Sequence, residues 1–141
     1  MRKIIFVALA LVCLYATSFA QSKTPTAVIT AFNQKFPNAS KVKWDKENDK
    51  EYEAGFQWKG IKHSANFSNN GEWLETESPT TFAKLPMKVQ NSFNANHKNS
   101  RVTAVAQIET STGKTKFEIE FMQGAKTVEV FYDENGNEIK M

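Results

Sequence analysis

The sequence has little cysteine, proline or glycine: one, four and six residues in a chain of 141. With Cys13 as the single cysteine, no disulfide can form within the chain and no zinc site can be built on several cysteines. So few prolines and glycines exclude a collagen-like or low-complexity chain. No apolar run reaches the roughly 20 residues that a membrane-spanning helix requires. The composition is that of one small globular domain or two very small ones.

An excess of charge of one sign is also missing. The chain has 18 basic and 15 acidic residues, and Arg2 and Lys3 lie in its first twenty positions. The remaining 16 basic and 15 acidic residues give a net charge of +1. A nearly neutral body gives no electrostatic reason to bind nucleic acid or an anionic membrane.

Sequence patterns of catalytic and metal sites are lacking as well. There is no nucleophile-elbow serine, no HExxH pair and no phosphate-binding loop. Of the two histidines, His63 falls on a core-facing alternation and is predicted to be structural, whereas His97 lies in a polar helix end and is predicted to be solvated. The run 133–138 resembles a calcium loop, but its glycine is in the wrong position and a turn is predicted. We predict no enzyme activity, no metal and no cofactor.

The first twenty residues are typical of a bacterial secretory signal peptide. Arg2 and Lys3 precede an apolar stretch from Ile4 to Tyr15, and small residues end the segment at Ala20. Cleavage is therefore predicted before Gln21, which would remove Cys13 and leave residues 21–141 as the exported domain. A cysteine-free exported domain fits the periplasm or the outside of a bacterial cell.

The remainder of the chain contains an internal repeat. Residues of similar type recur 65 positions apart in three pairs: Phe56 and Phe121, Gly71 and Gly136, Leu74 and Ile139. Upstream, two further pairs are 61 positions apart: Val28 and Val89, Phe32 and Phe93. Because the matches keep their order, we predict a duplication with repeats at 24–77 and 78–141.

Each repeat is predicted to begin with a short helix. In the first, Thr24 would cap the helix and Pro25 would occupy its first position. Val28, Phe32 and Phe36 would form one apolar stripe before Pro37 ends the helix. In the second repeat, Pro86 starts the helix and Val89 and Phe93 form the stripe.

Apolar and polar residues alternate after each helix, which predicts half-buried antiparallel strands. Tight turns are predicted at Lys59-Gly60 and Gln123-Gly124, and further turns at 69–71 and 134–136. The predicted fold class is α+β, built from tandem helix-plus-antiparallel-sheet repeats, with the helices covering one sheet face and the other face in water. The junction over residues 75–81 allows either two sheets or one continuous sheet.

The pattern resembles the PepSY-like, β-lactamase-inhibitor-like family of exported bacterial proteins. The resemblance is carried by core and turn positions across nearly the whole exported domain: Ala31-Phe32, Phe36-Pro37, Trp44, Gly71-Glu72-Trp73-Leu74, Leu85-Pro86 and the closing run Phe131 to Gly136. It implies two sheets joined into one curved surface that grips a protein. It also implies kinship with PepSY domains, which are associated with peptidase propeptides.

The same alternation suggests which residues would contact a partner. Trp73 and Phe131 are predicted to point to the wet face, where aromatic side chains give a protein interface large buried area. Four acidic residues would favour a basic patch on the partner: Glu53, Glu118, Glu120 and Glu129. The predicted function is a non-enzymatic protein-binding module whose candidate target is an exported hydrolase. The alternatives are a structural, envelope-associated module and a small-ligand carrier.

Overall fold

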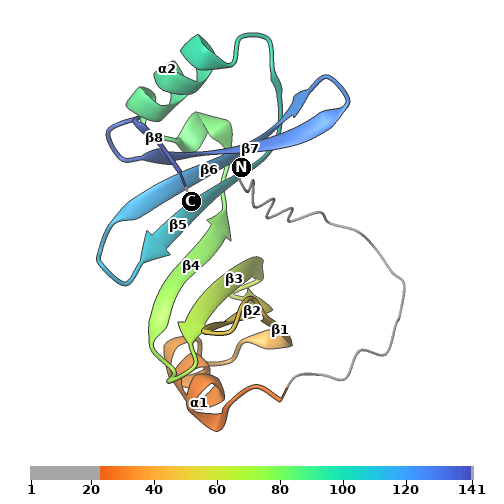
Figure 1. The fold of residues 1–141 in the computed structure, drawn as a ribbon, viewed down its shortest axis with the longest axis vertical. Helices are drawn as coiled ribbons and strands as arrows, with labels where there is room; N and C mark the ends of the chain where they lie inside the picture. Colours follow the sequence, from red (N-terminus) through yellow and green to blue (C-terminus); the bar gives the residue numbers. More distant parts are fainter. Residues whose placement is uncertain (1–22, 141) are drawn as a thin grey trace.

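The computed structural model describes residues 23–140, so the predicted signal peptide and its cleavage before Gln21 lie outside the described residues. The elements follow one another as two similar sets of a helix and four strands, with a 3-10 turn, η1 (Phe82–Lys84), between the sets (Figure 1). The first set is α1 (Thr26–Lys35), β1 (Ser40–Lys46), β2 (Glu51–Trp58), β3 (Ile61–Ser68) and β4 (Trp73–Pro79). The second set is α2 (Met87–Asn96), β5 (Arg101–Thr110), β6 (Thr115–Gln123), β7 (Lys126–Asp133) and β8 (Glu138–Ile139).

All strands of the described chain belong to one antiparallel sheet, in the order β1 to β8. The repeats join where β4 pairs with β5, from Glu75 opposite Thr110 to Pro79 opposite Ala106. The sheet is therefore continuous, and the predicted α+β class with helix-plus-sheet repeats is confirmed.

Both helices cover the same face of this sheet. On β5, Val105 packs in the core beneath α2, and Glu109 points to the same side four residues later. Glu109 lies opposite Thr76, which in turn lies opposite Ala65 in the core beneath α1. In Figure 1 the two helices lie at opposite ends of the molecule, so the middle of the sheet lies between them.

Each helix buries its apolar stripe in a separate core. Phe32 on α1 contacts the rings of Phe36, Trp44, Phe56 and Phe67 at centroid distances of 4.9 to 6.1 Å. On α2, Phe93 occupies the equivalent position. The two cores share no residue, so the repeats are stabilised by equivalent but independent packing.

At one pair of facing core positions, the two repeats divide the side-chain volume differently between the strands. In the first repeat, the large Trp44 lies opposite the small Ala54. In the second repeat the equivalent pair is Val105 opposite Ile119, with two side chains of intermediate size. In each repeat the two facing side chains together bring a similar volume to the core, although both positions differ.

The helix starts differ from the prediction by one residue. Pro25 is the N-cap of α1, and its carbonyl oxygen accepts hydrogen bonds from the N–H groups of Val28 (3.0 Å) and Ile29 (3.2 Å). Pro86 is the N-cap of α2 in the same way. The predicted cap at Thr24 is wrong, because no side chain caps α1 and the proline carbonyl already begins the helical hydrogen bonding.

The turns after the third strand of each repeat contact the first turn of the helix. Gly71 and Gly136 have φ values of 86° and 81°, a left-handed conformation that favours glycine. A Cβ atom on Gly71 would lie 2.6 Å from the carbonyl oxygen of Ala27, and one on Gly136 would lie 2.6 Å from that of Lys88. These glycines therefore set how closely each helix approaches its sheet.

The predicted hairpin turns are nearly in place. Lys59 and Gly60 form the β2–β3 turn, with φ values of 51° and 82°. In the second repeat the turn residues are Gly124 and Ala125 rather than Gln123 and Gly124, because Gln123 still pairs with Lys126.

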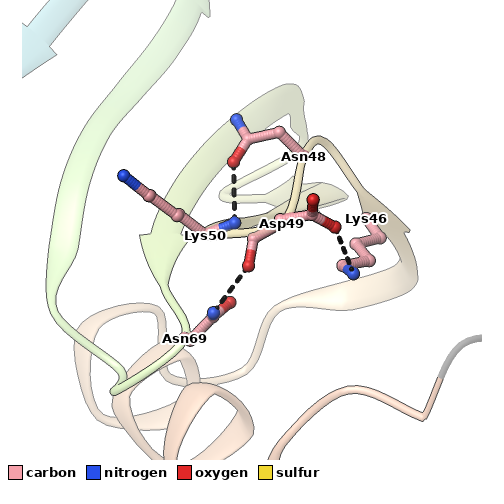
Figure 2. A network of polar contacts seen from close by, with 5 residues as sticks. All are labelled: Lys46, Asn48, Asp49, Lys50 and Asn69. Carbon is pink, nitrogen blue, oxygen red and sulfur yellow. Dashed lines mark hydrogen bonds and ion pairs between the residues drawn. The ribbon is translucent and has the colours of Figure 1, made fainter.

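A polar network fixes the β1–β2 hairpin against the β3–β4 turn (Figure 2). The Asn69 Nδ2 group donates to the Asp49 carbonyl oxygen at 2.8 Å, and the Asn69 N–H donates to Lys50 O at 3.0 Å. Asn48 Oδ1 accepts from the Lys50 N–H at 2.8 Å, and Lys46 Nζ lies 3.1 Å from Asp49 Oδ1. The edge strand β1 is thus held by its loop as well as by its pairing with β2.

Candidate protein-binding face

The sheet face opposite the helices carries the candidate site, and we call its central part the open face. Successive side chains of a strand point to opposite faces of the sheet. The residues that alternate with those of the two helix-covered cores therefore lie on the open face. The open face is formed by Glu53, Gly55, Ser64, Asn66, Glu75, Glu77, Ala106, Ile108, Lys116, Glu118, Glu120, Glu129 and Phe131.

Strand β5 supplies an apolar centre to the open face. Ile108 and Ala106 are only 2% and 7% exposed although neither helix of the described residues covers this side. Glu77 on β4 lies opposite Ile108, and Glu118 on β6 lies opposite Ala106. The neighbouring side chains of the face therefore cover the centre, and these two carboxylates lie against apolar groups.

Six carboxylates surround this centre. The four predicted residues, Glu53, Glu118, Glu120 and Glu129, all lie on the open face. Sequence reasoning missed Glu75 and Glu77, which β4 places on the same side. Their alternate spacing in Glu-Thr-Glu was the available signal.

Burial raises the pKa of several of these groups. The pKa of Glu118 is raised from 4.5 to about 8, first by loss of water and then by the charges of Glu77, Glu129 and Glu120. The pKa of Glu77 is raised to about 7, again first by burial and then by Glu53, Glu75 and Glu129. Burial also raises the pKa of Glu53, against the lowering effect of its hydrogen bond with Ser64.

Like charges also meet directly across strands. Glu120 lies opposite Glu129 in the β6–β7 register, an arrangement that costs stability in a sheet. Glu120 accepts a hydrogen bond from the Thr103 hydroxyl at 2.5 Å. Lys116 Nζ lies 3.6 Å from Glu75 Oε2. The face thus concentrates carboxyl groups on a surface that is partly dehydrated.

The aromatic residue Phe131 has the predicted orientation. It is half-buried on the open face, opposite Glu118 on β6 and Ile139 on β8. Its neighbours in sequence, Val130 and Tyr132, both pack in the core beneath α2.

The predicted orientation of Trp73 is wrong. The β3–β4 register shifts next to the pair of Phe67 and Trp73, so Leu74 adds one residue to β4 and reverses the alternation. Trp73 packs against the core beneath α1, and its Nε1 group donates to Thr76 Oγ1 at 2.8 Å. The Lys35 ammonium lies 3.5 Å from the ring centroid. Trp73 is therefore a packing residue of the helix-covered side.

The sequence matches the PepSY-like family, described as candidate beta-lactamase-inhibitor-like proteins, over residues 14–62 and again over 51–140. The chain belongs to this family. The two matches cover almost the whole chain, in agreement with the two helix-plus-sheet repeats. Among curated proteins, none matches the chain.

Solved structures share the PepSY-like fold. A BLIP-like protein from Bacteroides fragilis is 28% identical with a TM-score of 0.65, covering 82% of this chain and 83% of that one. A DUF2874 family protein from Bacteroides ovatus is 25% identical with a TM-score of 0.70, covering 82% and 84%. A candidate periplasmic protein from Bacteroides eggerthii has a TM-score of 0.74 at 19% identity, covering 83% and 86%.

The histidines of this PepSY-like chain are both packed on aromatic rings. His63 stacks on Phe56 at 5.7 Å, and its Nδ1 atom lies 2.9 Å from Ser78 Oγ, which fits the predicted structural role. The prediction of a solvated His97 is wrong. Its ring packs 4.6 Å from that of Phe121, because His97 ends α2 at the position where Phe36 ends α1.

Within residues 23–140, no group of three or more histidine, cysteine or acidic side chains has the arrangement of a metal site. In the same part of this PepSY-like chain, no helix is long and apolar enough to cross a bilayer.

The raised pKa values predict that stability falls as the pH rises. The folded protein binds more protons than the unfolded chain between pH 4.5 and about 8, so its free energy of unfolding decreases across this window. We expect a lower melting temperature at about pH 9 than at about pH 6. Thermal unfolding followed by circular dichroism would measure it.

Glu118→Gln should weaken this pH dependence and should raise the melting temperature on the alkaline side. The matched control is Glu109→Gln, which removes an exposed carboxylate from the helix-covered face. If both variants kept the slope of the unaltered protein, Glu118 would not be the group responsible.

Proposed function

We propose that the chain is an exported, non-enzymatic module that binds a protein through its open face. The observation that carries this proposal is the combination on one face of an apolar centre, the half-buried Phe131 and six surrounding carboxylates. Within residues 23–140 both α-helices occupy the other face, which leaves this side of the sheet for a partner. Its membership of a beta-lactamase-inhibitor-like family supports a binding role rather than catalysis.

The charge of the face supports a partner with a basic surface. In the free protein, carboxylates such as Glu118 and Glu77 bear the cost of burial and mutual repulsion. Lysine or arginine side chains of a partner would relieve that repulsion, while the half-buried Phe131 would lose its remaining contact with water. Complementary charge would also speed the encounter at low salt.

We further propose an exported hydrolase as the target, which the module would restrain by blocking access to its active site. The supporting observation is the likeness to a BLIP-like protein at 28% identity. The predicted signal sequence at residues 1–20 would place the protein in the periplasm or outside the cell.

A capture experiment tests the binding proposal. The protein, immobilised, would be exposed to envelope extract, alongside the variant Phe131→Ala/Glu118→Gln. The matched control is Ile29→Ala/Glu109→Gln, which alters an exposed apolar side chain and a carboxylate away from the open face.

We expect a hydrolase to be retained by the unaltered protein and by the control, with at least tenfold less on the open-face variant. The hydrolase should lose activity when bound. Equal recovery on all three baits would exclude the open face as the binding surface and would favour a structural role in the envelope.

A small-ligand carrier is the second candidate. A hollow of about 410 Å³ lies where the repeats meet, lined by Trp73 of β4 and by Glu109, Thr110 and Lys114 around the β5–β6 loop. Ligand binding there would raise the melting temperature with ligand concentration. If the chain binds a protein instead, its melting temperature should rise with the protein partner and not with small ligands.

A further inference from the structure

The outer edge of β7 is covered by a neighbouring strand over only part of its length. In the described part of the chain, β7 lies between β6 and β8. Strand β8 consists of Glu138 and Ile139, which pair with Tyr132 and Phe131. From Lys126 to Val130, β8 does not pair with β7. The outer backbone N–H and C=O groups of this part of β7 can therefore pair with another strand.

The first repeat shows what fits against this edge. The registers of β2–β3 and β6–β7 are identical, with every pair shifted by 65 positions. Beside β3, however, β4 continues past the turn, and Thr76 and Glu77 pair with Ala65 and Ser64. The equivalents of Ala65 and Ser64 are Val130 and Glu129, where β8 has already ended. The second repeat thus has the framework for a full fourth strand, and within residues 23–140 β8 occupies only the first two positions of it.

We propose that the β7 edge from Lys126 to Val130 binds an extended segment of a partner protein as an added antiparallel strand. Main-chain hydrogen bonds would supply the affinity, as in other cases where a peptide lengthens a sheet. Opposite Val130 and Glu129, the segment would occupy the place that Thr76 and Glu77 of β4 occupy in the first repeat, and it would continue along the edge to Lys126.

The side chains along this edge define the chemistry of the segment. Val130 is 5% exposed and Val128 packs against the core beneath α2, so partner residues opposite them would be apolar. Between them, Glu129 lies on the open face, directly opposite Glu120. A partner residue opposite Glu129 would therefore be lysine or arginine. The segment has the pattern apolar–basic–apolar.

The opposite edge of the sheet, formed by β1, is unfavourable for the addition of a strand. Strand β1 carries Lys41, Lys43 and Lys46, and its register with β2 shifts between Ser40 and Lys43. Lysines and a bulge on an edge strand hinder the addition of another strand. A basic segment would therefore select the β7 edge over the β1 edge.

The test uses the peptide acetyl-Thr-Val-Lys-Val-Thr-amide and the same peptide with glutamate in place of lysine. Each would be titrated into the isotope-labelled protein, and backbone amide shifts would be followed by NMR. We expect the shifts to concentrate on Val128 and Val130 and their β6 neighbours, with at least fivefold tighter binding of the lysine peptide. Glu129→Gln should remove the preference between the two peptides, and Glu129→Lys should reverse it.

Shifts confined to β1 or to the helices, or no shift at β7 with millimolar peptide, would overturn the proposal. Equal affinity of both peptides for the unaltered protein would overturn the assigned chemistry. Addition of the strand does not rest on the proposed function of the open face, because it uses the backbone edge; only the preference for a basic residue uses an open-face side chain, that of Glu129. Phe131→Ala/Glu118→Gln, which tests the open face, should leave the peptide preference in place.

Discussion

Phe32→Ala is expected to destabilise the protein by about 3–5 kcal/mol, close to the whole stability of many small domains. Phe32 is 2% exposed, and its ring touches four other aromatic rings of the core beneath α1. Removing it leaves a cavity bounded by rings that are fixed on three strands and on the end of the helix. The surroundings can therefore collapse only partly, and the contact energy of all four rings is lost. Urea unfolding followed by tryptophan fluorescence would measure the change.

The matched control is Ile29→Ala, which removes an aliphatic side chain from the same helix. Ile29 is 39% exposed, so its loss should cost less than about 1 kcal/mol. Alanine favours the helix in both variants, so similar losses would show that burial of the apolar stripe is not what holds α1 on the sheet.

Gly136→Ala is the second substitution with a large expected effect, a loss of about 3 kcal/mol. The backbone of Gly136 is left-handed, with φ of 81°, which costs about 1–2 kcal/mol for a residue with a Cβ atom. The added methyl group would also lie 2.6 Å from the carbonyl oxygen of Lys88. Because that contact is with backbone in the first turn of α2, the helix itself must move, which costs about 1–3 kcal/mol more. Gly71→Ala should behave alike, through Ala27.

Gly60→Ala separates the two contributions. Gly60 has nearly the same φ, 82°, but a Cβ atom there would meet nothing within 4 Å. Its loss should be limited to the conformational cost of about 1–2 kcal/mol. Thermal unfolding of the three variants would compare them. If Gly60→Ala were as harmful as Gly136→Ala, the close approach of turn and helix would not matter.

Much of the fold could be predicted from the sequence because the relevant signals are local. Val28 and Phe32 recur at helical spacing, and the strands alternate cleanly, as in Phe117, Ile119 and Phe121. The duplication adds independent support, since each repeat predicts the other. These signals require only the periodicity of the backbone and the burial of apolar side chains.

The parts that could not be predicted depend on contacts between strands. The extra residue at Leu74 reverses the alternation of β4, so the sequence alone assigned Trp73 to the wrong face. The burial of Ile108 on a helix-free face follows from the pairing of β4 with β5, which no local pattern specifies. His97 was predicted to be solvated because its neighbours in sequence are polar. It occupies the helix-end position that Phe36 occupies in the first repeat, and its ring therefore packs against the core.

The volume exchange between the facing pairs also bears on engineering of the protein. A consensus repeat could be designed by choosing the residue at each position separately. The first facing position would then take the residue of Trp44 or Val105, and the second that of Ala54 or Ile119. Two of the four combinations never occur in the natural chain: tryptophan against isoleucine overfills the layer, and valine against alanine leaves it hollow. The two facing positions therefore have to be changed together. Sequence can be exchanged between the repeats only if both residues of the pair move at once.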